Sequence, residues 1–383
     1  MKKTKFKCVF IITAIFMALS CKNNVNVQVK KGDNSAQTVA EDYFNIVCMQ
    51  SNMVNARALT EECYPDILYE TIITDENEEI ISFADLDAES QKKFYEVWKE
   101  DFIGDLTGKL LTDSNLKEIV EIENEAFIET ASSSSRAVFT ERDIESFFKQ
   151  YEKKLNKLVK NSVAARGASS GDSLIRIEDG EIIPESLKIF SENYKKGRFL
   201  VNTNSSDSDI SGYLGHTSLM CYDNVEPNWA KDISLKATIT SYPLNTTKGT
   251  TWVGQTDGVQ YEPIGYWCGT KGAPTVLILD VYRTVWKWFT KTAYMATDEE
   301  HNTAVDKADD HLGKPYNWDF VKLKKDKGMW DTDKFYCSSL VFRAWYDTNK
   351  KYSLHTNFLY VRPASLVASN NSIIIARYKN EEE

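Results

Sequence analysis

Two hydrophobic patterns divide the chain into an N-terminal and a C-terminal half. From Val39 to about Ala165, apolar residues recur every three or four positions, which is the period of amphipathic helices with charged outer faces. One predicted helix covers Glu89 to Phe102, and a second covers Arg142 to Val163. The first buries Phe94, Val97, Trp98 and Phe102, and the second buries Ile144, Phe147, Phe148, Tyr151, Leu155 and Leu158. We therefore expect residues 39–165 to form a helical accessory domain.

The C-terminal half alternates apolar and polar residues in short runs separated by turn residues, which is typical of strands. Residues 166–194, with Gly and Ser at 167–171, read as a linker at the boundary. Strands are predicted at 199–201, 217–222, 235–241, 259–266, 275–282 and 372–378, and helices at 297–312 and 336–346. Several strands followed by helices indicate an α+β fold for the domain at 195–379.

The N-terminus has the features of an export signal. Lys2, Lys3, Lys5 and Lys7 precede the apolar run Val9 to Ala18, which is too short to span a bilayer. The residues Ala18-Leu19-Ser20-Cys21 resemble a bacterial lipobox, although Leu19 lies two rather than three positions before the cysteine. This resemblance implies a signal peptide at 1–20, lipidation of Cys21 and a polar tether at 21–38. An ordinary signal peptide cut nearby is the alternative, and in both cases the protein leaves the cytoplasm. With the lipid anchor it is expected in the cell envelope, attached to a bacterial membrane.

Charge limits the classes of partner. The formal net charge of −10 becomes −14 once the four signal lysines are removed. An acidic chain does not fit nucleic acid or adsorption to anionic lipid, so any membrane attachment is expected through the lipid anchor.

Five cysteines remain after Cys8 leaves with the signal and Cys21 is lipidated: Cys48, Cys63, Cys221, Cys268 and Cys337. An exported compartment permits disulfides. If Cys337 stays free, pairing Cys48 with Cys63 and Cys221 with Cys268 keeps each bridge within one predicted domain, and it is one of three connectivities. No CxxC spacing is present, so neither a metal nor another cofactor is expected.

The candidate chemistry lies at Cys337 and His216. Cys337 begins an apolar segment in which Val341, Ala344 and Trp345 fall on its helical face. A thiol in the first turn of a helix is close to the positive end of the dipole, which favours the nucleophilic thiolate. His216 begins an apolar strand and is one of four histidines. A thiolate with an imidazole partner is the minimum for acyl transfer, whereas an inert buried cysteine is the structural alternative.

Four landmarks in the C-terminal half resemble those of a known family, and they occur in its order. They are Gly215-His216, the segment Asp257 to Pro263, the segment His311 to Phe320 containing Gly-Lys-Pro-Tyr, and Phe335-Tyr336-Cys337-Ser338. Arg362-Pro363-Ala364 follows, as the family's segment after the helix does. Residues 195–378 thus resemble the circularly permuted papain-like amidases, which are related to NlpC cell-wall peptidases and typified by the YiiX and YaeF proteins.

The resemblance implies a small β-barrel or curved sheet packed on the helix that carries Cys337. It makes Cys337 the nucleophile and His216 the base, with a thioacyl intermediate and an oxyanion held by the Cys337 backbone N–H. Tyr316 would line the cleft or simply pack there. Ser338 matches the motif as a substrate-side residue, although its hydroxyl is better placed to cap the helix.

The sequence departs from the family at three places. A polar residue, often Glu, usually orients the histidine from the next strand, and Thr240 is the best match in Ala237 to Tyr242. The family's Gly-Asp before the histidine strand is Gly197-Arg198 here, and its Glu after Cys-Ser is Ser339. These departures keep open a binding protein built on an enzyme fold.

The remaining candidates are interpreted as structural. His301 is expected on the solvated face of a helix, His311 at the end of that helix, and His355 in a polar loop. The aromatic run at 285–289 is expected to line the cleft or pack the barrel rather than stack on carbohydrate.

The leading functional hypothesis is an exported, lipid-anchored cysteine hydrolase acting on an amide or related acyl bond. A peptide or peptidoglycan fragment is the expected substrate. Acyl lipids are the rival, since relatives such as lecithin retinol acyltransferase move acyl chains. The alternative from another class is a non-catalytic surface lipoprotein that uses a degenerate cleft for recognition.

Overall fold

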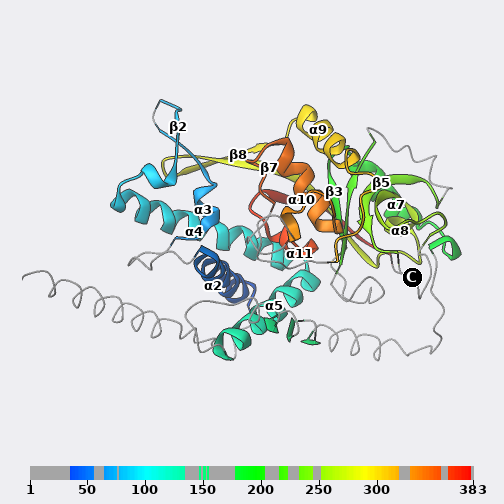
Figure 1. The fold of residues 1–383 in the computed structure, drawn as a ribbon, viewed down its shortest axis with the longest axis horizontal. Helices are drawn as coiled ribbons and strands as arrows, with labels where there is room; N and C mark the ends of the chain where they lie inside the picture. Colours follow the sequence, from blue (N-terminus) through cyan, green and yellow to red (C-terminus); the bar gives the residue numbers. More distant parts are fainter. Residues whose placement is uncertain are drawn as a thin grey trace, which may run out of the picture.

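The protein was analysed as a computed structural model with a mixed α+β fold (Figure 1). The structure describes residues 35–55, 64–75, 77–133, 146, 147, 150, 151, 153, 154, 177–202, 215–222, 233–244, 252–318, 328–354 and 361–380. The predicted signal peptide, Cys21 and the tether before residue 35 lie outside these residues, as do Cys63, His355 and the Gly/Ser run at 167–171.

A mixed open sheet forms the centre of the fold, in the order β2-β1-β7-β3-β4-β5-β6. Its strands are β1 (Ile72–Thr74), β2 (Ile80–Ile81), β3 (Phe199–Asn202), β4 (His216–Met220), β5 (Lys236–Tyr242), β6 (Gly258–Pro263) and β7 (Thr275–Lys287). Two more strands, β8 (Thr290–Met295) and β9 (Ser372–Lys379), pair antiparallel with β7. The described strands form an open sheet and not a closed barrel.

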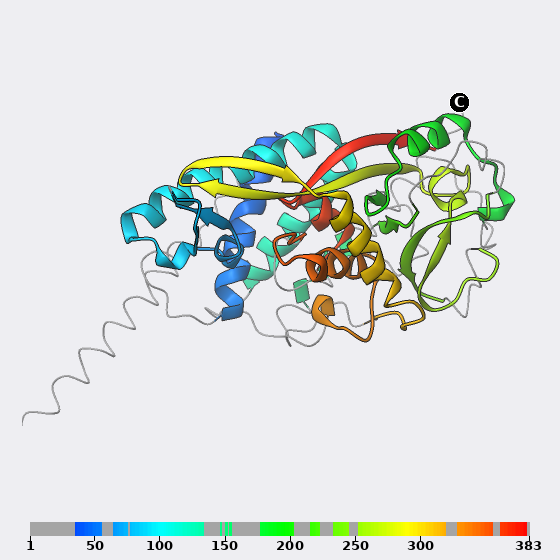
Figure 2. The same cartoon turned by 90° about the horizontal axis from the view of Figure 1, so that it is seen from above.

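Strand β7 is the longest strand and connects the two halves of the molecule (Figures 1 and 2). Its first half lies between β3 and β9, and its second half lies between β1 and β8. The aromatic run at 285–289 therefore falls at the end of β7 and in the turn into β8. Trp286 is buried there against Phe94 of the N-terminal helices, with ring centroids 5.3 Å apart.

Alternating side chains give the sheet two apolar faces, as the two-residue period of a strand requires. On β3, Phe199 and Val201 join one core cluster and Leu200 joins the other. The first face is covered by α9 (Asp298–Asp309), α10 (Cys337–Thr348) and α11 (Pro363–Ala368). The second is covered by α7 (Pro184–Asn193) and α8 (Gly265–Cys268).

The N-terminal half is helical, as predicted, but it is not separate from the sheet. It contains α2 (Ala36–Asn55), the short α3 (Asp66–Tyr69), α4 (Ala88–Thr112) and α5 (Ser114–Ser133). Strand β1, in the middle of this half, pairs in parallel with β7, and one apolar cluster runs from α2, α4 and α5 into the face that holds α10. The segment predicted as a linker contains α7, which packs on β9. The two predicted domains therefore share one core.

Most of the predicted elements have counterparts in the structure, with shifted ends. The helix expected from Glu89 extends from Ala88 to Thr112 and buries Phe94, Trp98 and Phe102, whereas Val97 is half-buried. Of the helix expected at 142–163 only a few positions are described, with Phe147 and Tyr151 buried. The strand expected at 259–266 ends at Pro263, because Gly265 to Cys268 turn into α8.

Candidate active site

Cys337 is the first residue of α10, as the apolar pattern predicted. The backbone N–H of Tyr336 donates to the Ser339 hydroxyl at 2.9 Å, and this bond caps the start of the helix. Tyr336 has an extended backbone (φ −101°), so the chain turns into the helix at the thiol. Cys337 is 8% exposed, in contrast to the fully buried apolar residues behind it on the same helix.

His216 is the first residue of β4 and makes a buried ion pair with Glu262 of β6. The distance from His216 Nε2 to Glu262 Oε1 is 2.8 Å, and both side chains are completely buried. A carboxylate oxygen only accepts, so Nε2 carries a proton and the other ring nitrogen, Nδ1, is left for another partner. Within the described part of the chain, Nδ1 forms no hydrogen bond.

Cys337 is a neighbour of His216, and its thiol is one of the groups that raise the pKa of the imidazole against the opposing effect of burial. Because Glu262 occupies Nε2, Nδ1 is the ring nitrogen left to act on the thiol. The three side chains Cys337, His216 and Glu262 therefore lie in the order nucleophile, base and orienting carboxylate, and we refer to them as the Cys–His–Glu site.

Two further donors hold the Glu262 carboxylate. The Trp267 indole N–H donates to Oε2 at 2.7 Å, and the Thr238 hydroxyl donates to the same oxygen at 3.2 Å. Thr238 lies directly opposite Glu262 in the pairing of β5 with β6. A buried carboxylate is costly unless its oxygens accept hydrogen bonds, and these donors supply those bonds.

Aromatic rings enclose the imidazole of His216. Trp267 stacks on it with centroids 5.6 Å apart and planes 14° apart, while Tyr266 and Tyr242 approach edge-on at 4.8 Å and 5.1 Å. Burial in this enclosure lowers the pKa of His216, but the charge of Glu262 and the contact with Cys337 outweigh it and raise the pKa to about 10. Glu262 therefore favours the protonated form of the ring.

Thr240, the residue predicted to orient His216, lies next to the same nitrogen in a secondary position. Its hydroxyl oxygen is 3.4 Å from Nε2, and its proton is donated to the Thr217 carbonyl at 2.7 Å. Glu262, and not Thr240, makes the short contact. Sequence reasoning missed Glu262 because it searched only the strand after His216, whereas the carboxylate comes from the following strand. The available signal was an acidic residue within a segment predicted to be a buried strand.

The two predicted substrate-side residues are both buried. Tyr316 packs against Trp318 with centroids 5.0 Å apart, and its backbone forms a bridge with Phe335, two residues before Cys337. The Ser338 hydroxyl donates to the Val361 carbonyl at 2.9 Å. The expectation that Ser338 caps the helix is therefore wrong, because Ser339 takes that place.

Of the other described histidines, His301 differs from its predicted surroundings, and His311 lies just after the end of α9, as expected. His301 is buried rather than solvated, with Nε2 at 2.8 Å from Asp280 and Nδ1 at 2.9 Å from the Thr297 carbonyl. Arg198, at a departure from the family motif, donates to the same Asp280 at 2.8 Å. His311 stacks on Phe335 at 4.4 Å, and burial, followed by the charge of Lys314, lowers its pKa.

The described cysteines are free thiols: Cys48, Cys221, Cys268 and Cys337. The predicted bridge between Cys221 and Cys268 is not present, because the two residues belong to clusters on opposite faces of the sheet. Cys221 donates to the Ala237 carbonyl at 3.1 Å, and the Cys268 sulfur lies 3.6 Å from the Tyr378 hydroxyl. Burial raises the pKa of both thiols to about 12, so neither resembles a nucleophile. The proposed partner of Cys48, Cys63, lies outside the described residues.

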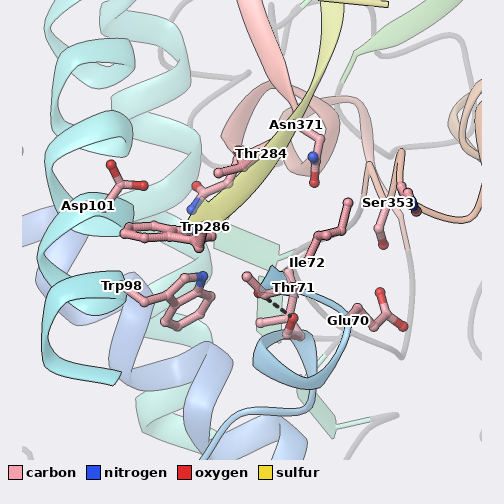
Figure 3. Close-up of a pocket in the computed structure, with 12 residues that line it drawn as sticks. Glu70, Thr71, Ile72, Trp98, Asp101, Thr284, Trp286, Ser353 and Asn371 are labelled. Carbon is pink, nitrogen blue, oxygen red and sulfur yellow. Dashed lines mark hydrogen bonds between the residues drawn. The ribbon is translucent and has the colours of Figure 1, made fainter. Parts of the chain in front are cut away.

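A separate cavity of about 50 Å³ lies between the N-terminal helices and β7 (Figure 3). Trp98 and Trp286 line it on one side, and Glu70, Thr284 and Ser353 line it elsewhere. Neither Cys337 nor His216 reaches this cavity, so it is not the cleft of the Cys–His–Glu site.

In the part of the chain that the structure describes, no group of three or more His, Cys, Asp or Glu side chains could hold a metal. Among the described helices, none has the length and apolar character needed to cross a membrane. Comparisons with protein-family models, curated proteins and solved structures found no match to this chain.

Proposed function

We propose that this protein is an exported, lipid-anchored cysteine hydrolase that cleaves an amide or related acyl bond. The observation that supports this proposal most strongly is the buried Glu262–His216 pair, which leaves one ring nitrogen for Cys337 at the start of α10. The order of histidine before cysteine fits a permuted papain-like domain. Export and acylation of Cys21 rest on the N-terminal sequence alone.

The reaction follows from the positions of the three groups. The Cys337 thiolate attacks the carbonyl carbon of the substrate, and the C=O electrons move to oxygen. The backbone N–H of Cys337, at the start of α10, stabilises that oxyanion. The carbonyl re-forms, the bond to the leaving group breaks, and the protonated His216 gives its Nδ1 proton to the leaving nitrogen or oxygen.

The second half of the reaction regenerates the enzyme. Neutral His216 takes a proton from a water molecule, and the resulting hydroxide attacks the thioester carbon. The carbon–sulfur bond breaks, releasing a carboxylic acid and the Cys337 thiolate beside the protonated His216. Glu262 holds the imidazole in one tautomer throughout and balances its positive charge. A peptide of the cell wall is the proposed substrate for a protein anchored in the cell envelope.

The first test is alkylation of Cys337 by iodoacetamide as a function of pH, with His216→Ala as the comparison. Mass spectrometry of the peptide containing Cys337 separates its label from that of the other cysteines. We expect fast labelling at neutral pH in the wild type and at least a roughly tenfold loss in His216→Ala, since the imidazolium stabilises the thiolate.

Hydrolysis assays with cell-wall peptides and with acyl esters then decide the substrate class. We expect Cys337→Ser to abolish turnover while the protein keeps its fold. Slow labelling of Cys337, at the same rate in the wild type and in His216→Ala, would favour the non-catalytic lipoprotein instead. Turnover that survives Cys337→Ser would exclude the thioacyl mechanism.

A further inference from the structure

A short segment after α10 contacts both sides of the Cys–His–Glu site. It consists of Val361, Arg362 and Pro363, and we call it the bridging segment. It leads directly into α11, since Arg362 precedes the first residue of that helix. Its three residues face three different parts of the molecule: the nucleophile, the base and the N-terminal helices.

Val361 is tied to the two neighbours of Cys337. Its carbonyl accepts from the Ser338 hydroxyl at 2.9 Å, and its N–H donates to the Tyr336 hydroxyl at 3.2 Å. Residues 336 and 338 flank the nucleophile on both sides. A displacement of Val361 would therefore move the first turn of α10, and with it the thiol.

Pro363 lies against the residue before His216. A Cβ atom built on Gly215 would be 3.4 Å from the Pro363 Cβ, and only 2.1 Å from the Asn202 carbonyl. Gly215 has φ +90°, a conformation that favours glycine, so the backbone before His216 has little freedom to move away from these neighbours. The bridging segment thus packs on the base side as well as on the nucleophile side.

Arg362 anchors this segment to the N-terminal helices. Its guanidinium lies 4.2 Å from the centre of the Tyr151 ring and forms an ion pair with Glu123 of α5. The Arg362 and Glu123 side chains are only 9% and 2% exposed. A planar guanidinium held between a ring face and a carboxylate has a defined position, which a single exposed ion pair would not provide.

We propose that the N-terminal helices position the Cys337–His216 pair through Arg362, with Glu123 and Tyr151 as positioning residues. The inference rests on the proposed function and assigns a role to the helical half of the chain. Reacting groups need accurate placement, and a misplacement of about 1 Å by a distant change can cost on the order of a hundredfold in rate. Loss of the anchor is therefore expected to weaken the thiolate–imidazolium pair without removing either member.

The test compares Cys337 alkylation across pH in full-length wild type, Glu123→Gln and Asp101→Asn. Glu123→Gln keeps the size of the side chain and removes the charge that holds Arg362. Asp101→Asn is the matched control, because Asp101 makes another ion pair between α4 and the sheet, to Lys291 at 2.7 Å, away from the bridging segment. We expect Glu123→Gln to slow alkylation at neutral pH about tenfold and to move the rate curve to higher pH. We expect the alkylation rate of the Asp101→Asn control to stay within about twofold of the wild-type rate, since exposed or half-buried ion pairs contribute little to stability.

Tyr151→Leu keeps the test decisive if Glu123→Gln does not fold. It keeps both members of the ion pair and most of the apolar volume, and it removes the ring face over which Arg362 lies together with the ring's hydroxyl. A slower rate and a shifted pH curve in either folded variant support the inference. Wild-type rates and pH curves in the folded variants, or an equal loss in Asp101→Asn, overturn it.

Failure of the proposed function is visible separately in the same experiment. Alkylation of the wild type would then be slow and unaffected by His216→Ala, before any change in the helices is considered. A wild type that depends on His216, together with unaffected Glu123→Gln and Tyr151→Leu variants, would leave the proposed function in place and remove only the role of the helices.

Discussion

At the scale of single residues, the Cys–His–Glu site depends on a carboxylate that is completely removed from water. Glu262 accepts from His216, Trp267 and Thr238, so both of its oxygens are used. By occupying Nε2, the fixed carboxylate leaves Nδ1 as the nitrogen available to Cys337, and it favours the protonated form of the imidazole. Thr240 is a neighbour of this arrangement, and its hydroxyl is already committed to the Thr217 carbonyl.

Replacement of Glu262 by Gln separates the roles of Glu262 and Thr240. We expect Glu262→Gln to slow Cys337 alkylation at neutral pH at least about tenfold, because each 1.36 kcal/mol of lost interaction with the imidazolium is a factor of ten in its ionisation. Breaking a buried pair is also expected to cost roughly 3–5 kcal/mol of folding free energy.

Thr240→Val is the matched control and should reduce the alkylation rate less than about threefold. The variant loses only one ordinary hydrogen bond to the imidazole ring, which contributes about 1 kcal/mol. Alkylation rates and urea unfolding curves measure both effects. A larger loss in Thr240→Val than in Glu262→Gln would restore Thr240 as the orienting residue.

At the scale of elements, the site is built where one strand and one helix begin. His216 pairs with Asn202 at the end of β3, so its position depends on how closely β3 and β4 approach. The residue before it, Gly215, permits that approach, because its missing side chain would occupy the space of the Asn202 carbonyl. The start of α10 is defined in the same local manner by Ser339, which satisfies the Tyr336 N–H.

Gly215→Ala tests the close approach of β3 and β4. The added Cβ would meet the Asn202 carbonyl at 2.1 Å in a backbone with φ +90°, so we expect a loss of about 2–4 kcal/mol in the free energy of unfolding. Gly254→Ala is a suitable control, since Gly254 also has a positive φ but has nothing within 4 Å of the added atom. Equal losses in the two variants would show that backbone strain, and not the approach to Asn202, dominates.

At the scale of the whole molecule, the N-terminal helices and the sheet form one folded unit. β1 adds to the same sheet as β4, and a continuous apolar cluster includes both Phe102 of α4 and Leu340 of α10. The buried ion pair between Glu123 and Arg362 crosses the same boundary. The stability of the candidate site is therefore a property of the complete chain.

The raised pKa of His216 links this stability to pH. Below about pH 6.5 the histidine is protonated in both the folded and the unfolded chain, and the stabilisation by Glu262 is fully present. As the pH rises toward the folded-state pKa of about 10, the stabilisation is lost. The free energy of unfolding should thus fall over this range, by at most about 1.4 kcal/mol per pH unit for one proton.

Urea unfolding at a series of pH values measures this slope. Glu262→Gln should remove most of it. An unchanged slope in Glu262→Gln would mean that another group carries the pH dependence.

Local patterns in the sequence were sufficient for the elements and for two members of the site. The helical period at 89–102, the alternation at 199–201 and the apolar face behind Cys337 all arise from side chains close together in the chain. For this reason they predicted an α+β fold, with Cys337 starting a helix and His216 starting a strand.

The tertiary structure alone decided which distant groups meet. Glu262 reaches His216 because β5 lies between β4 and β6 and the carboxylate points to the ring across it, which no local pattern encodes. The parallel pairing of β1 with the end of β7 joins residues more than two hundred positions apart. Because of this pairing, the N-terminal half, predicted as a separate accessory domain, shares its core with the sheet. The tertiary structure likewise decided that Cys221 and Cys268 do not form a disulfide, because the sheet separates the two thiols.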